Sequence, residues 1–381
     1  SPERSLPGET TSANSADLCG FARENRRLES QSRLPHQAAS LQREPPDASP
    51  AGLPTASRAP SALQAETPSA EEGPTPRPPL WKAWLISARP QTLTACAAPV
   101  VVGSALAAAG PGWRPELALV ALLAAGGIQI GTNFVNDAAD AATGADDGER
   151  IGPPRAVAQG WLSARAVWIG AALSFGLALA LGGVLIAACG WPLLVIGLSS
   201  IAAGYAYTAG PFPLAYLGLG DLFVVLFFGE VATLGTYYVH TGHMSWPVAL
   251  AGLGLGLLAT GILVANNLRD RAGDARANKR TLVVRFGERL GRWEYALCLL
   301  VPFAILPLPP LLGAGPWTWL LPLLILPWAL SSARAVLRRR SPEAPGSGDY
   351  RVDGVDLIPR LVEAARIQLV YGLLLGLGVA L

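Results

Sequence analysis

The sequence predicts an all-α integral membrane protein with about nine transmembrane helices. Of its 381 residues, 51% are hydrophobic and only 15% are charged, which is little charge for a water-soluble chain. The apolar residues also fall in runs of about twenty, the length that a helix needs to cross the hydrocarbon core of a bilayer. Proline-glycine turns and arginine-rich loops separate these runs, so each run is expected to form one span.

The chain divides by composition into residues 1–79 and 80–381. Residues 1–79 are rich in Pro, Ser, Ala, Glu, Arg and Gln and lack apolar periodicity. Such a segment buries too little surface to offset the entropy of ordering, so we expect a disordered tail. It has no hydrophobic stretch of the secretory type, and its acidic residues argue against an organellar targeting peptide. Residues 80–381 are expected to form the transmembrane domain.

The membrane domain begins with Trp81, Lys82 and Trp84, whose rings and cation suit the lipid headgroup region. Arg89-Pro90 follows, and a proline fits the first turn of a helix. Nine spans are predicted from there, at residues 91–109, 116–136, 164–187, 191–209, 217–239, 246–268, 293–312, 316–336 and 361–380.

The distribution of basic residues predicts the orientation of these spans. Arginines and lysines gather in the loops that follow the second, sixth and eighth spans, whereas the opposite loops offer essentially Arg114. Basic loops stay in the cytoplasm. We therefore expect a multi-pass protein of the cell (inner) membrane, with the N-terminus and these three loops cytoplasmic.

A first polar motif lies at residues 133–155, at the end of the second apolar run. It places six carboxamides and carboxylates within fifteen residues: Asn133, Asn136, Asp137, Asp140, Asp146 and Asp147. Carboxylates so close to a bilayer indicate a functional site. Asn133, Asp137 and Asp140 share one helix face, and Asn136 and Asp140 form an adjoining i, i+4 pair. Gly144 is expected to end the helix and to let Asp146 fold back over the bundle.

A second polar motif, residues 266–280, ends the sixth run. Asn266, Asp270 and Asp274 are spaced by four residues, again on one helix face, and Lys279 and Arg280 follow. Four spans separate the two motifs, so both lie on the same side of the membrane. Hard oxygen ligands on two helices suit Mg²⁺, which is usually shared with substrate phosphates. The cations suit the remaining phosphate oxygens.

Simpler explanations exist for each feature alone. Asp and Asn near helix ends commonly act as caps, and two such motifs in equivalent positions make that explanation weaker. A cation-coupled transporter also uses intramembrane carboxylates, but near the bilayer midplane rather than at one face. The four cysteines and three histidines show no zinc-type spacing, and nothing indicates nucleic-acid binding or an obligatory protein partner.

Several longer strings resemble those of UbiA-type intramembrane aromatic prenyltransferases. The first is RPQTL at residues 89–93. NDxxDxxxGxD at 136–146 is followed by GPPRAV at 152–157. The last group is NNLRD at 266–270, KRTL at 279–282 and RFG at 285–287. The resemblance covers about residues 84–381, and within the family it is strongest to the 1,4-dihydroxy-2-naphthoate prenyltransferases of menaquinone biosynthesis.

The resemblance implies a helical bundle with a central cavity and a lateral opening to the lipid. It implies Mg²⁺-dependent transfer of a polyprenyl group from polyprenyl diphosphate to 1,4-dihydroxy-2-naphthoate, with loss of CO₂ and diphosphate, to give demethylmenaquinone. The alternative within the family is another acceptor, such as 4-hydroxybenzoate, homogentisate or a chlorin.

The resemblance also implies roles for individual residues. The expected metal ligands are Asn136, Asp137, Asp140, Asp146, Asp270 and Asp274. The expected catalytic residues are Asp140, Asp270, Asp274 and Asp221. Residues expected to bind the diphosphate or the acceptor are Asn133, Arg155, Tyr205, Asn266, Arg269, Lys279 and Arg280. Glu230, in the middle of a span, has no role to carry over and is expected to be a neutral, hydrogen-bonded carboxyl group.

Overall fold

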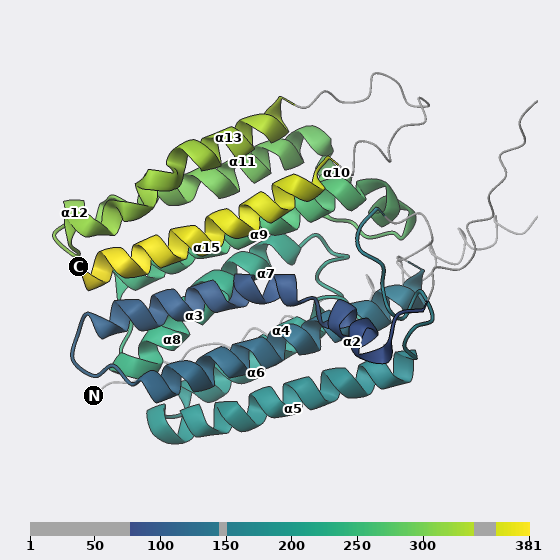
Figure 1. Ribbon diagram of the computed structural model, residues 1–381, viewed down its shortest axis with the longest axis horizontal. Helices are drawn as coiled ribbons and strands as arrows, with labels where there is room; N and C mark the ends of the chain where they lie inside the picture. Colours follow the sequence, from purple (N-terminus) through teal and green to yellow (C-terminus); the bar gives the residue numbers. More distant parts are fainter. Residues whose placement is uncertain (1–76, 145–150, 339–355) are drawn as a thin grey trace, which may run out of the picture. The chain divides into compact units, whose positions relative to one another are not determined.

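The described part of the protein, residues 77–144, 151–338 and 356–381 of the computed structural model, is a bundle of helices without strands (Figure 1). Eight helical runs in these ranges are long and apolar enough to cross a membrane. A ninth apolar helix, α6 (Pro192–Ala206), has 15 residues. The predicted all-α class with about nine spans is confirmed. Residues 1–76 of the expected tail lie outside the described ranges.

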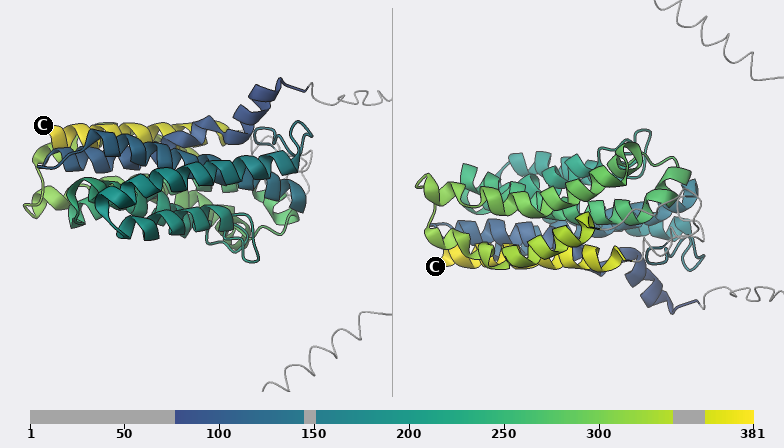
Figure 2. Two further views of the ribbon diagram at one scale, coloured as in Figure 1. Left: turned by 90° about the horizontal axis from the view of Figure 1, so that it is seen from below. Right: turned by 90° about the horizontal axis from the view of Figure 1, so that it is seen from above.

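The first crossing is broken near its start. Helix α2 (Leu80–Ala88) leads into a 3₁₀ turn, η1 (Pro90–Thr92), and then into α3 (Leu93–Ala108). Between α2 and η1, Arg89 adopts a left-handed conformation with φ 51°. From the sequence, Arg89-Pro90 was expected to open the first helix. The structure adds α2 before it, and α2 projects from the end of the bundle (Figure 2).

The next three helices are α4 (Pro115–Thr143), α5 (Ala164–Cys189) and α6. Helix α4 extends beyond the apolar run that predicted it, and it ends at Gly144 with φ 72°. The expected helix break at this glycine is confirmed, because the left-handed cap that a glycine accepts is present. Helix α4 packs along α5 and also contacts α3 and α6.

The fifth crossing combines α7 (Gly220–Val225), the π-helical segment η2 (Leu226–Val231) and α8 (Ala232–Thr241). It packs on α9 (Trp246–Arg276), the longest helix described. A Cβ atom at Gly256 of α9 would lie 2.5 Å from the backbone oxygen of Val225. Small residues of this kind let two helix backbones approach closely within a membrane.

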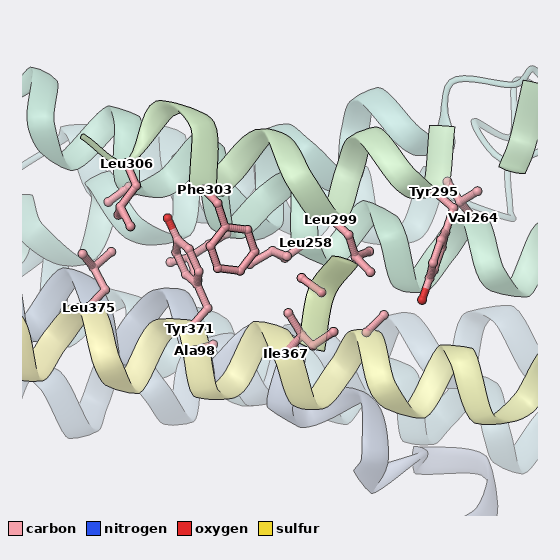
Figure 3. Packing of buried hydrophobic residues seen from close by; sticks show 14 of the residues in the cluster. Ala98, Leu258, Val264, Tyr295, Leu299, Phe303, Leu306, Ile367, Tyr371 and Leu375 are labelled. Carbon is pink, nitrogen blue, oxygen red and sulfur yellow. The ribbon is translucent and has the colours of Figure 1, made fainter. Parts of the chain in front are cut away.

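The remaining elements complete the second half of the bundle. They are α10 (Leu282–Phe286), α11 (Glu288–Ile305), α12 (Leu308–Leu311), η3 (Trp317–Ile325), α13 (Leu326–Leu337) and α15 (Ile358–Ala380). Phe303 of α11 and Tyr371 of α15 meet edge to face with ring centroids 5.3 Å apart (Figure 3). The Tyr371 hydroxyl donates to the Pro302 carbonyl, so this buried polar group is satisfied.

Helix α9 joins the two halves, because it contacts α3 and α8 on one side and α11 and α15 on the other. The C-terminal turns of α4 and α9, which carry the two polar motifs, line one cavity. The prediction that both motifs lie at the same end of the bundle is therefore confirmed.

Candidate active site

A polar cavity with about 740 Å³ of empty space lies between the ends of α4 and α9. Nine of the residues singled out from the sequence line it: Asn136, Asp140, Arg155, Asp221, Asn266, Arg269, Asp270, Asp274 and Lys279. Segments from five parts of the chain thus converge, although they are up to about 140 residues apart. The cavity holds four carboxylates and at least three cations in close proximity, so it can bind a group with several negative oxygens through cations and metal.

Asp140 is the most enclosed carboxylate of this cavity, with 2% of its surface exposed. One oxygen, Oδ2, lies 3.3 Å from the Arg155 guanidinium and 3.9 Å from Lys279 Nζ. The other, Oδ1, accepts a hydrogen bond of 3.3 Å from the Tyr216 hydroxyl. Two cations and a phenol therefore compensate the cost of burying this charge.

Lys279 connects the two polar motifs. Its Nζ lies 3.9 Å from Asp140 of the first motif and 3.9 Å from Asp274 of the second. It also lies 5.6 Å from the centre of the Tyr216 ring, within the range of a cation–π contact. The ammonium group thus stands between carboxylates that would otherwise repel each other across the cavity.

The second motif contains a tighter ion pair. Arg269 Nε and Nη2 each donate to one oxygen of Asp270, both at 2.7 Å. A two-pronged pair of this type fixes the plane of both side chains. Arg269 is almost fully buried, whereas Asp270 keeps one fifth of its side chain exposed and faces the cavity.

Two tyrosines of the loop 207–219 belong to the site. Burial raises the pKa of Tyr216 to about 12, and the nearby Asp140 carboxylate adds to the increase. Burial raises the pKa of Tyr207 as well, reinforced by Asp221 and Asp140. Both phenols are therefore protonated at neutral pH, and Tyr216 is a hydrogen-bond donor to Asp140.

Four predicted site residues do not line the polar cavity: Asn133, Asp137, Tyr205 and Arg280. Asn133 and Asp137 face α2 instead, where their side chains have several hydrogen-bond partners. The Tyr205 ring packs beside Trp168 at 6.2 Å and is 45% exposed. Arg280 is exposed. Asp146, the remaining predicted ligand, lies outside the described residues.

Further residues of the cavity were not singled out from the sequence. Tyr207, two positions after Tyr205, lies on the wall, and its neighbour Thr208 donates to the Asn136 carboxamide oxygen. Arg89 also lines the cavity. Tyr205 was the residue expected from this loop, but the direction in which the helix ends places Tyr207 on the cavity wall instead. Arg89 could have been singled out from the sequence, because it begins the RPQTL string.

A second, apolar cavity with about 1030 Å³ of empty space lies within the bundle, next to the polar one. Its walls come from α3, α4, α5, α6 and the crossing α7–η2–α8, and Tyr207 lines both cavities. Leu185, Leu193 and Val239 are among the lining residues. Helix α6 packs on α4 and α5 but makes few contacts with α7 and η2, so this side of the cavity is loosely closed.

The donor set of the polar cavity fits Mg²⁺. Asn136, Asp140, Asp270 and Asp274 present carboxamide and carboxylate oxygens to one cavity, and hard oxygen ligands are those that Mg²⁺ prefers. Within the described ranges, no three Asp, Glu, His or Cys side chains converge closely enough to hold an ion by themselves. An ion here would complete its coordination with water and phosphate oxygens, as Mg²⁺ commonly does.

Fold and site together define a membrane-embedded protein that can hold a polyanionic group beside an apolar chain. Residues 96–348 match the UbiA prenyltransferase family. The chain is 38% identical to the 1,4-dihydroxy-2-naphthoate octaprenyltransferase of Mycobacterium tuberculosis over 76% of its length and 94% of that protein. It is 37% identical to the Escherichia coli protein of the same name, over 69% of this chain and 87% of that protein. The protein belongs to the UbiA prenyltransferase family and is a multi-pass membrane prenyltransferase.

Solved structures share the fold. A UbiA homolog from Archaeoglobus fulgidus bound to DMAPP and Mg²⁺ superimposes with a TM-score of 0.57, at 16% identity, over 77% of this chain and 99% of that one. The helical UbiA fold is thus confirmed, and a cation-coupled transporter is no longer supported.

Proposed function

We propose that this enzyme transfers a polyprenyl group from polyprenyl diphosphate to 1,4-dihydroxy-2-naphthoate, with loss of diphosphate and CO₂. The observation that carries the proposal is the junction at Tyr207, where a cavity of acids and cations meets an apolar cavity. A polyprenyl diphosphate has the same division between a charged head and a long apolar tail. The naphthoate acceptor follows the names of the relatives that this chain resembles.

Each part of the substrate has a place in this arrangement. The prenyl tail lies in the apolar cavity, and the diphosphate lies in the polar one near Lys279, Arg155 and Arg269. Asn136, Asp140, Asp270 and Asp274 would hold Mg²⁺, which when bound neutralises the charge that develops on the leaving diphosphate. The allylic carbon is thereby held at Tyr207, where head and tail meet.

The chemistry requires that the bond between the allylic carbon and the diphosphate oxygen breaks, and that its electron pair leaves with the diphosphate. The electron-rich ring of the acceptor then forms the new carbon–carbon bond, and the carboxylate leaves as CO₂. The face of the Tyr207 ring can stabilise positive charge on the allylic carbon. The ring carbon that forms the new bond releases a proton, and the ring carbon that loses CO₂ takes one up, so the two steps balance. Asp221, on the same wall, is the group that we assign to this proton transfer.

The orientation belongs to the same proposal. With the polar cavity on the cytoplasmic side of the cell membrane, both charged substrates reach it from water, and the basic loops agree with this direction. Helix α6 crosses the membrane as the fourth of nine spans.

The test is turnover by membranes or vesicles that contain the full-length protein, polyprenyl diphosphate and Mg²⁺. The acceptors are 1,4-dihydroxy-2-naphthoate, 4-hydroxybenzoate, homogentisate and a chlorin, with products identified by mass spectrometry. We expect prenylation of the naphthoate and release of its carboxyl carbon, followed with a carboxyl-labelled acceptor. Turnover of another acceptor alone would replace the naphthoate assignment. If no acceptor in the panel reacts with the folded protein, the proposed substrates are wrong.

A further inference from the structure

The first polar motif divides into two pairs on α4. Asn136 and Asp140 line the polar cavity. Asn133 and Asp137, on the adjoining face of the same helix, face α2 and the turn after it. All four side chains are buried. Asparagine and aspartate recur at i, i+4 in both pairs, so the sequence spacing alone does not distinguish the cavity-facing pair from the other.

Asp137 is fully buried and is held by groups outside the cavity. Its Oδ2 accepts a hydrogen bond of 2.6 Å from the Ser87 hydroxyl in the last turn of α2. Its Oδ1 accepts from the backbone N–H of Val157 at 3.4 Å. The carboxylate therefore ties α2 and the segment 151–163 to α4, and both of its oxygens are used for this purpose.

Asn133 contacts the chain on both sides of Arg89. Its Nδ2 donates to the Ala88 carbonyl at 2.8 Å and to Thr92 Oγ1 at 2.9 Å. The Thr92 hydroxyl in turn donates to the Arg89 carbonyl at 2.9 Å. Ala88, immediately before Arg89, and Thr92, three residues after it, are thus bonded to α4, and the Arg89 carbonyl is linked to α4 through the Thr92 hydroxyl.

Arg89 itself has an uncommon backbone. Apart from glycines, only Arg89 and Asn278 have positive φ within the described ranges. A conformation of this kind persists where its surroundings hold it, and such residues gather at functional sites. The turn changes the direction of the chain between α2 and η1, and Arg89 lines the polar cavity together with Asn136 and Asp140.

We propose that Asn133 and Asp137 are positioning residues that hold the left-handed turn at Arg89, and that the Arg89 guanidinium binds an anionic oxygen of a substrate in the polar cavity. This inference rests on the proposed function, because it assumes that the cavity binds a substrate anion. That anion is either the diphosphate of the prenyl donor or the carboxylate of the aromatic acceptor, since a guanidinium recognises both in the same two-pronged way.

The experiment compares three variants of the full-length protein. Arg89→Gly removes the guanidinium but accepts the left-handed backbone. Asp137→Asn keeps the size of the side chain and removes its charge. Ser87→Ala removes one hydrogen bond to Asp137 and is the mildest change, so it remains informative if Asp137→Asn does not fold. Ser174→Ala is the matched control, because Ser174 bonds only within α5, to the Gly170 carbonyl.

We expect Arg89→Gly to raise the KM for one substrate, donor or acceptor, about tenfold, which corresponds to about 1.4 kcal/mol. Asp137→Asn and Ser87→Ala should raise the KM for that same substrate, by smaller factors. The double variant Arg89→Gly/Asp137→Asn should be no worse than Arg89→Gly, because both changes remove one interaction. The Mg²⁺ concentration for half-maximal rate should stay unchanged, whereas Asp140→Asn should shift it.

The substrate whose KM rises identifies the anion. Multiplying effects in the double variant, or a shift of the Mg²⁺ requirement by Asp137→Asn, would overturn the assignment. So would unchanged KM values for both substrates in Arg89→Gly.

A binding measurement separates this inference from the proposed function. Inorganic diphosphate with Mg²⁺, and 1,4-dihydroxy-2-naphthoate alone, are each tested for an increase in the melting temperature of the detergent-solubilised protein. If the wild type binds diphosphate but turns over none of the acceptors, the proposed reaction fails, and the variants are compared by binding instead. Loss of the same ligand-induced increase in Arg89→Gly and Ser87→Ala supports the positioning role. An undiminished increase in both variants overturns it.

Discussion

At the scale of single residues, charge balance organises the candidate site. The carboxylates of the two motifs are separated by cations, with Lys279 between Asp140 and Asp274 and Arg269 against Asp270. Each cation lowers the cost of keeping a carboxylate buried near a membrane. A phosphate group that enters the cavity meets donors that are already in place and needs little rearrangement of the protein.

Replacing Asp140 or Asp270 by asparagine should lower the rate of prenyl transfer by on the order of 10² to 10³-fold, the usual cost of losing one charge-stabilising group. The measurement is the initial rate with saturating Mg²⁺ in vesicles. Glu116→Gln is the control, because this exposed carboxylate lies at the opposite end of α4. Near-normal rates in both aspartate variants would exclude them as ligands.

The Tyr216 phenol predicts a dependence of stability on pH. Its pKa is about 12 in the folded protein and about 10 in the unfolded chain, so folding favours the protonated form. This contribution to the free energy of unfolding is fully present below about pH 10 and is lost as the pH rises from about 10 to 12. Between those values the melting temperature of the wild type should fall more steeply than that of Tyr216→Phe. Parallel melting curves for the wild type and Tyr216→Phe would show that folding does not raise the pKa of Tyr216.

At the scale of helices, close approach matters more than large side chains. The lipid is as apolar as the helix surfaces, so helices gain little from burying leucine against leucine. The contact between η2 and α9 depends instead on Gly229, Gly252 and Gly256, where an added Cβ would lie within about 3 Å of backbone atoms of the facing segment.

Gly256→Ala should therefore destabilise the protein, although alanine is the better helix former by about 1 kcal/mol. The new methyl group would press on the Val225 carbonyl, and the backbones of η2 and α9 would have to separate. The melting temperature in detergent measures the effect. Gly183→Ala on α5 is the control, since a Cβ there meets no atom within 4 Å. Equal stability of the two variants would contradict the tight packing.

Hydropathy located the spans because a helix in lipid must satisfy its own backbone hydrogen bonds, which leaves few alternatives. It could not locate α2, whose register depends on Ser87 and Ala88 meeting Asp137 and Asn133 far along the chain. The apolar spans stop at residues 136 and 268, short of the ends of α4 and α9, because the last turns of both helices are polar. Those turns carry the motifs, so the metal-type spacing was visible in the sequence. Which of the two i, i+4 pairs faces the cavity depends on tertiary packing.

At the scale of the whole molecule, the number of crossings decides on which side the C-terminus lies. Helix α6 has 15 residues and is about 22 Å long, shorter than the hydrocarbon core of roughly 30 Å. It still runs from Leu193 in the apolar cavity to Tyr207 at the polar one, so we expect it to cross as the fourth of nine spans. The end of α15 lies at the opposite end of the bundle from the last turns of α4 and α9 (Figure 1).

A fusion of alkaline phosphatase to Leu381 should then be active, and a fusion of green fluorescent protein at the same site should be dark, because each reporter works on only one side of the membrane. Reporters placed after Arg276, at the end of α9, should give the opposite pattern. A fluorescent C-terminal fusion together with an active phosphatase fusion after Arg276 would mean that the polar cavity faces away from the cytoplasm and would overturn the proposed orientation.

The junction at Tyr207 also separates the routes by which products depart. On the proposed reaction, diphosphate is released from the polar cavity, whose lining is charged, into water. The prenylated product carries neither the carboxylate of the acceptor nor the diphosphate of the donor. It therefore binds best in the apolar cavity and along the loosely packed side between α6 and α7. After turnover, the two products therefore leave independently: diphosphate enters the water, and the prenylated product enters the lipid. Added diphosphate should compete with the donor, whereas the composition of the bilayer should control how fast the quinol product clears.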